Sequence, residues 1–119
     1  MEKTMVPFIE DFIKKEKLNL SVTKNNPFEF WLDDKTGSVT VRFKINTKHH
    51  EISYDVYSPE YTIHLKEETI QDVERLESLA ENNKKWTLAE SIENIWLVLD
   101  QMELWARQHH FHITEKQLI

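Results

Sequence analysis

Apolar and polar residues alternate along most of residues 18–66, in five short runs. The runs read LNLSV, FEFWL, VTVRFKI, EISYDVY and YTIHL, and they cover 18–22, 28–32, 39–45, 51–57 and 61–65. A period of two residues is typical of a strand with one face buried and the other in water. Short polar connections separate the runs, and such connections join antiparallel neighbours. The pattern therefore predicts an antiparallel meander sheet of about five strands.

The alternation assigns each strand residue to one face of this sheet. It is strict over 39–45, so Phe43 is expected to face the core while Arg42 and Lys44 face solvent. The rest of the expected core side is Leu18, Leu20, Val22, Phe28, Phe30, Leu32, Val39, Val41, Ile45, Ile52, Tyr54, Val56, Ile63 and Leu65. The expected solvent side also holds Thr40, Glu51, Ser53, Asp55, Thr62 and His64, with Trp31 and Tyr57 as aromatic exceptions.

Helical periodicity flanks the strand region on both sides. Residues 5–16 place their large apolar side chains on one helical face, namely Met5, Phe8, Ile9, Phe12 and Ile13. A narrower apolar stripe predicts a second helix over about 70–82. Thr87 and Glu90 form a capping box that opens a third helix, which runs to about His110.

Length and composition bound the class of protein. A chain of 119 residues is most simply one domain, so we expect residues 1–119 to form a single two-layer α+β unit. Its one N-terminal and two C-terminal helices would pack on one face of the sheet. The chain has no cysteine, which excludes disulfides and thiolate metal sites. A net charge of −6 argues against a nucleic-acid partner.

Nothing in the sequence indicates export or membrane insertion. The amphipathic start contains Glu10 and Asp11, unlike a secretory signal, and no apolar run approaches the roughly 18 residues that span a bilayer. We therefore expect a cytoplasmic protein with no membrane partner. The many Lys, Asn, Ile and Glu residues are compatible with an AT-rich bacterial genome.

The third predicted helix carries more apolar residues than one core stripe uses. Leu97 and Leu104 lie about 180° from that stripe, and Trp105 flanks them. Either another part of the chain covers these leucines, or they form a seam with a partner or with a second copy in a homodimer. With the two aromatic exceptions on the sheet, the interface candidates are Trp31, Tyr57, Leu97, Leu104 and Trp105.

Three histidines near the end of this helix, His109, His110 and His112, come closest to a metal-binding motif. Adjacent helical residues point about 100° apart, so the three cannot all face one ion within a helix. No nearby carboxylate or cysteine completes a tetrahedral set. We expect these side chains to interact with the helix C-terminus, and we predict no metal and no cofactor. The remaining histidines have no diagnostic spacing: His49, His50 and His64.

The sequence holds no motif typical of catalysis. Asp33 and Asp34 suit a hairpin turn, and Glu67 and Glu68 suit the start of a helix. No serine lies in a G-x-S-x-G elbow, and Gly37, the single glycine, leaves no phosphate-binding loop. The sequence therefore favours a non-catalytic role over an enzymatic one.

The predicted order of helix, meander, helix and helix resembles that of ubiquitin-conjugating-like interaction domains of the RWD type. The resemblance covers element order alone. That group carries a proline-rich Tyr-Pro segment, and the nearest counterpart in this chain, Tyr57-Ser58-Pro59-Glu60-Tyr61, differs from it. No residue and no activity is carried over.

We expect a non-catalytic protein-binding or regulatory module, such as a small cytosolic adaptor, an inhibitor of the immunity type or a chaperone-like factor. Its partner would be a protein or a second copy of the chain. The alternative is a small enzyme or metal-binding protein that uses histidine and acidic residues. A pocket that gathers several such side chains would favour the alternative, and a flat aromatic patch would favour binding.

Overall fold

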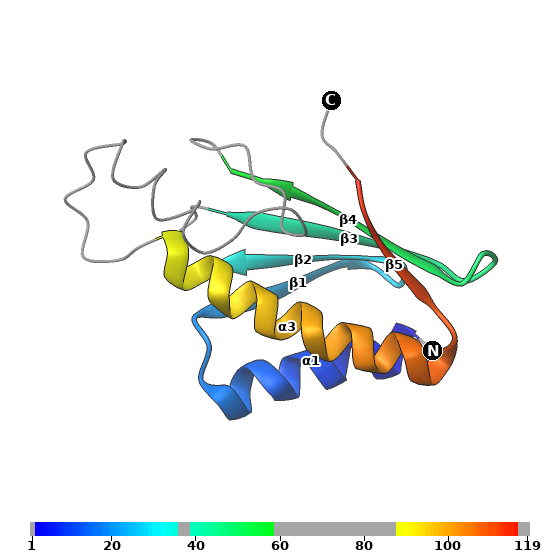
Figure 1. Ribbon diagram of the computed structural model, residues 1–119, viewed down its shortest axis with the longest axis horizontal. Helices are drawn as coiled ribbons and strands as arrows, with labels where there is room; N and C mark the ends of the chain where they lie inside the picture. Colours follow the sequence, from blue (N-terminus) through cyan, green and yellow to red (C-terminus); the bar gives the residue numbers. More distant parts are fainter. Residues whose placement is uncertain (1, 36–38, 59–87, 117–119) are drawn as a thin grey trace.

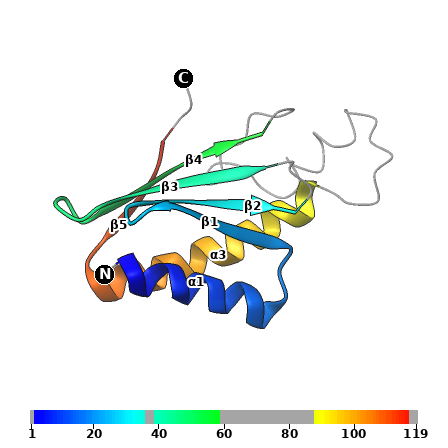
Figure 2. The ribbon, with the colours of Figure 1, turned by 180° about the vertical axis from the view of Figure 1, so that it is seen from behind.

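The computed structural model describes residues 2–35, 39–58 and 88–116 of the chain. They form a five-stranded sheet and two helices, α1 (Glu2–Glu16) and α3 (Leu88–His109), which lie side by side on one face of the sheet (Figures 1 and 2). The strands are β1 (Leu20–Asn26), β2 (Glu29–Asp34), β3 (Thr40–Asn46), β4 (Glu51–Tyr57) and β5 (His112–Glu115). The predicted α+β class, with helices layered on one face of a sheet, is confirmed.

Some predicted elements lie outside the described residues. These are the strand over 61–65 and the helix over 70–82, together with Thr87 of the capping box and Gly37 of the hairpin loop. The first and last predicted helices agree with α1 and α3 to within a few residues, as helix ends commonly do.

The fifth strand of the sheet differs from the prediction. The order is β1-β2-β3-β4-β5, and β1 to β4 pair antiparallel as expected. β5 instead follows α3 and pairs parallel to β4, with Ile113 opposite Ile52. The expectation of a purely antiparallel meander is therefore wrong at this edge, because a strand that returns through a helix can align parallel to its neighbour. Thr114 and Glu115 belong to this strand.

The core lies between the inner face of the sheet and the two helices. Val41, Phe43 and Ile45 of β3 are buried, as the alternation predicts. Phe43 stacks on Phe30 with ring centroids 4.7 Å apart and lies 5.6 Å from the ring of Tyr54. These three rings occupy one row across β2, β3 and β4, and such aromatic pairs stabilise a sheet beyond their buried area.

Two side chains depart from the predicted core face. Phe28 is exposed because it lies in the turn between β1 and β2, where its N–H donates to Asn26 Oδ1 at 2.8 Å. Phe8, assigned to the apolar face of α1, is also exposed, whereas the adjacent Ile9 is fully buried. Val6, which was not assigned to that face, is buried, so the apolar face of α1 is displaced from the predicted one.

The end of α3 turns the chain into β5 through a Schellman motif. The N–H of Phe111 donates to the Ala106 carbonyl at 2.8 Å, and His110 adopts the left-handed conformation with φ of 61°. The N–H of His112 then donates to the carbonyl of His50 at 2.8 Å. This bond joins β5 to the start of β4.

Asp34 connects the end of β2 to the first turn of α3. Its buried carboxylate accepts the N–H of Val39 at 3.2 Å and the hydroxyl of Ser91 at 2.9 Å. The neighbouring Asp33 accepts a hydrogen bond of 2.6 Å from the hydroxyl of Thr40. Both aspartates belong to β2 and not to the predicted loop, and Asp34 also fixes the helix layer against the sheet.

Candidate interaction surfaces

Alternate strand residues place a mixed polar and aromatic surface on the side of the sheet opposite α1 and α3 (Figures 1 and 2). We call this surface the outer face. Its members on the three central strands are Glu29, Trp31, Asp33, Thr40, Arg42, Lys44, Glu51, Ser53, Asp55 and Tyr57. Neither of the two described helices covers it.

The two aromatic members of the outer face lie where the sequence predicts. Trp31 is 39% exposed and Tyr57 is 50% exposed. Trp31 lies opposite Arg42, which lies opposite Asp55, and Tyr57 follows Asp55 two residues along β4. An amphipathic ring that stays half exposed can bury apolar area against a partner while its polar atom remains hydrated.

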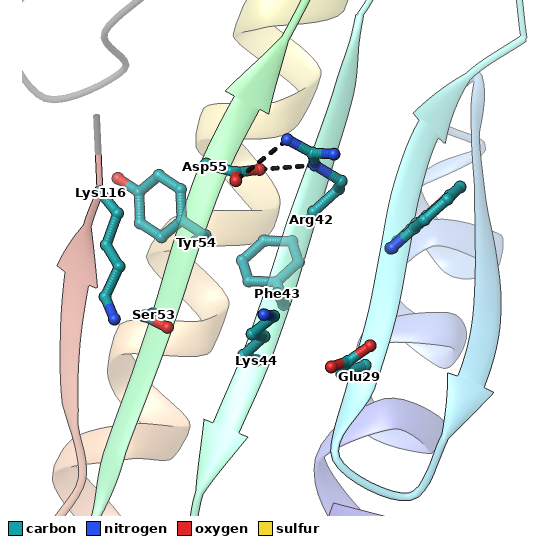
Figure 3. A pocket seen from close by; sticks show the side chains of 9 residues that line it. Glu29, Arg42, Phe43, Lys44, Ser53, Tyr54, Asp55 and Lys116 are labelled. Atoms are coloured by element: carbon teal, nitrogen blue, oxygen red, sulfur yellow. Dashed lines mark hydrogen bonds and ion pairs between the residues drawn. The ribbon is translucent and has the colours of Figure 1, made fainter. Parts of the chain in front are cut away.

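Arg42 and Asp55 form a bidentate ion pair between β3 and β4. Arg42 Nε lies 2.8 Å from Asp55 Oδ1, and Arg42 Nη2 lies 3.1 Å from Asp55 Oδ2 (Figure 3). The two residues are cross-strand partners, so both side chains leave the same face. Two parallel hydrogen bonds fix the orientation of the guanidinium, which a single bond does not achieve.

A pocket of about 330 Å³ opens on the outer face. Figure 3 shows Ser53 of β4 between Lys44 of β3 and Lys116, which follows β5. Ser53 points outward as predicted, yet it is only 7% exposed because longer side chains surround it. The complete lining is Glu29, Trp31, Arg42, Phe43, Lys44, Ser53, Tyr54, Asp55 and Lys116.

The pocket does not gather groups suited to one reaction. Its acidic members, Glu29 and Asp55, are accompanied by three basic side chains, and Asp55 is engaged by Arg42. A general acid and base need two titratable groups in contrasting environments beside one substrate position. The mixed charges and the exposed ring of Trp31 are more typical of a protein contact surface.

The leucine pair predicted on the last helix is exposed on α3. Leu97 is 46% exposed and Leu104 is 47% exposed, and both point away from the core. Val98 and Trp105 do not extend this pair, because both are buried in the core cluster. Trp105 packs against Phe111 with ring centroids 5.5 Å apart, so it contributes to folding instead of to the accessible surface.

The histidines at the end of α3 point in different directions. His109 Nδ1 lies 2.8 Å from the Trp105 carbonyl, and its ring stacks on the indole of Trp105 at 4.0 Å. His110 occupies the left-handed position after the helix, and His112 lies on β5. Among the described residues, no group of three or more histidine, aspartate or glutamate side chains could hold a metal ion.

Tyr54 is a titratable residue buried in the core. Its phenol makes no hydrogen bond within the described part of the chain. Burial raises the pKa of Tyr54 above its ordinary value, and the nearby carboxylates of Glu115 and Glu103 raise this pKa further. Since the ring faces the core and the hydroxyl is enclosed, this perturbation reflects packing and not a reactive site.

Comparison of the chain with protein-family models, with curated proteins and with solved structures finds no significant match. Neither described helix is long and apolar enough to cross a membrane.

Proposed function

We propose that the chain is a non-catalytic, cytosolic protein-binding module whose outer face contacts the partner. The observation that carries this proposal is the pair of half-exposed rings, Trp31 and Tyr57, on a sheet face that neither described helix covers. The ion pair of Arg42 and Asp55 lies between them and presents oriented polar groups. Aromatic and arginine side chains supply much of the binding energy in many protein interfaces.

A module of this kind acts by covering a surface of its partner. An adaptor, an inhibitor of the immunity type and a chaperone-like factor all work in this way, and none requires chemistry of its own. The mixed charges of the outer face favour a protein over a nucleic acid, because polyphosphate binding depends on clustered cations.

The outer face is tested by removing its two rings together. The wild type is expected to capture a partner protein from lysate of the native cells. We expect the double variant Trp31→Ala with Tyr57→Ala to capture about tenfold less of that protein, or less still. The matched control is Phe8→Ala, which removes an exposed ring on α1 in the other layer of the fold. Quantitative mass spectrometry measures the capture. Equal capture by the double variant and the control would refute the proposal.

A second candidate is self-association through α3. It is favoured by the exposed leucine pair, Leu97 and Leu104, because a two-fold contact is self-complementary and can place one helix against its own copy. Sedimentation of the wild type is expected to show a dimer that Leu97→Glu with Leu104→Glu converts to monomer. A wild type that stays monomeric at high concentration excludes this candidate.

A further inference from the structure

A second hollow lies between α1 and β1, at the opposite edge of the sheet from β5. Figure 2 shows α1 running beneath β1 along this edge. The hollow has a volume of about 400 Å³ and is lined by Glu10, Ile13, Lys14, Lys17, Leu18, Asn19, Leu20, Val22 and Lys35. We call it the edge groove. It shares no residue with the outer face.

The backbone of β1 is open along this groove. Among the described strands, β1 has a partner on one side only, namely β2. The N–H of Lys35 donates to the Asn19 carbonyl at 3.2 Å, and bonded and non-bonded positions alternate in an antiparallel pair. Asn19 and every second residue after it therefore point their backbone groups toward β2. The backbone N–H and C=O groups of Leu20 and Val22 point away from β2. Within the described part of the chain, these groups make no hydrogen bond.

Apolar side chains line the groove beneath this open edge. Ile13 of α1 and Leu20 of β1 are buried, while Leu18 and Val22 are half-buried. A strand that pairs with β1 would place every second side chain over Leu18 and Val22. The groove therefore offers backbone hydrogen bonds and apolar contact from the same few residues.

Lysines surround the groove. Lys14, Lys17 and Lys35 are exposed, and none has an ion-pair partner among the described residues. Glu10, the acidic lining residue, lies 3.6 Å from Lys24. The chain as a whole carries a net charge of −6, so the charge of this lysine cluster is opposite in sign to the net charge of the chain.

The helix end explains only part of the cluster. Lys14 and Lys17 lie at the carboxyl end of α1, where cations complement the helix dipole. Lys35 lies beyond the end of β2, and the dipole does not account for it. The helix end also does not account for the open edge of β1.

We propose that the edge groove binds an extended acidic segment of a partner protein, which adds to β1 as a further strand. The segment bonds to the N–H and C=O groups of Leu20 and Val22 and covers the apolar lining with the side chains that face α1. Its acidic residues lie at the end of the segment beside Leu18 and Asn19, where the three lysines gather. The straight edge ends at the register shift between Lys24 and Asn26, so the pairing covers the first part of β1. A second copy of the chain fits poorly, because pairing β1 with β1 brings two lysine clusters together.

The test uses a labelled peptide in which glutamates flank a short run of valine and threonine, and a counterpart with lysine in place of glutamate. Fluorescence anisotropy at low salt is expected to show binding of the acidic peptide alone. Lys14→Glu with Lys35→Glu is expected to weaken it by about tenfold or more. The control, Lys44→Glu with Lys48→Glu, makes the same charge change away from the groove and leaves the affinity within about twofold.

The strand pairing is tested by Val22→Pro. Proline at this position removes an N–H that points away from β2, a change that edge strands tolerate, so the variant is expected to fold and to lose peptide binding. In the wild type, the NMR amide resonances of Leu20 and Val22 are expected to shift on titration with the peptide. This measurement tests strand addition to β1 even if the proline variant does not fold.

Several results would overturn the edge-groove proposal. Equal loss of affinity in the two charge-reversed variants would show non-specific attraction, and unmoved resonances of β1 would exclude strand addition. Tighter binding of single-stranded DNA than of the acidic peptide would indicate a nucleic-acid site. Trp31→Ala with Tyr57→Ala is expected to leave peptide binding unchanged. The proposal for the outer face and the proposal for the edge groove are therefore tested independently.

Discussion

The hydroxyl of Tyr54 is a polar atom enclosed among core side chains with no hydrogen-bond partner in the described chain. The ring stabilises the core next to Phe43. The unfavourable contribution to the free energy of folding therefore comes from the hydroxyl, which is buried without a hydrogen bond. An unsatisfied buried hydroxyl costs about 1–3 kcal/mol. Tyr54→Phe is therefore expected to raise the free energy of unfolding by about 1 kcal/mol in urea denaturation. Tyr57→Phe, on the exposed outer face, is the control and should change it by less than about 0.5 kcal/mol.

The same residue makes stability sensitive to alkali. The unfolded chain ionises this tyrosine near its ordinary pKa of 10.0, whereas burial and two carboxylates keep the folded pKa above that value. The contribution is complete below the unfolded pKa and is lost as pH rises through the interval up to the raised pKa, because only the unfolded state releases the proton there. Denaturation curves above about pH 10 should show a steeper decline for wild type than for Tyr54→Phe. Parallel declines would contradict the assignment.

Ser91 provides a second test at the scale of one residue. Its hydroxyl donates to the buried carboxylate of Asp34, and a hydrogen bond to a charged group contributes about 1.5–3 kcal/mol. Ser91→Ala is expected to lower the free energy of unfolding by that amount. Ser21→Ala, at an exposed position of β1, is the matched control. Equal stability of the two variants would mean that Asp34 does not depend on this bond.

At the scale of an element, the end of α3 carries conformational strain. His110 adopts φ of 61°, a region that disfavours any residue with a Cβ and that glycine enters freely. His110→Gly is expected to raise the free energy of unfolding by about 0.5–1 kcal/mol. Gln108→Gly, two residues earlier and inside the helix, should lower it by about 1 kcal/mol. Opposite signs in thermal melts would confirm the motif, and two losses would contradict it.

The strands show how far local pattern predicts an element. The alternation of β3 fixed which face carries Arg42 and which carries Phe43, because a slip by one residue would reverse both. β5 was not predicted because it has only four residues, too few to show a clear alternation. Phe111 and Ile113 do alternate with polar residues, so a weak signal was present. The parallel pairing of β5 with β4 depends on the path of α3 across the sheet. Local patterns in the sequence do not predict that path.

Across the whole molecule, the interaction surfaces were predictable only where one element defines them. Trp31 and Tyr57 stand out because each interrupts a polar strand face, and Leu97 and Leu104 stand out by helical spacing. The same spacing makes Trp105 an interface candidate, but Phe111 packs against its ring after the chain reverses. The edge groove requires knowing that β1 lies at an edge beside α1, and strand order is a property of the assembled fold.

Site-specific photo-crosslinking in the native cells tests most directly whether the outer face contacts a protein. A photoreactive residue is placed at Trp31, at Tyr57 or, as the control, at Asp11, which is exposed on α1 in the opposite layer. The outer-face interpretation predicts that the same protein is crosslinked from the first two positions and not from the third. Adducts missing at both outer-face positions, or formed equally from Asp11, would contradict it.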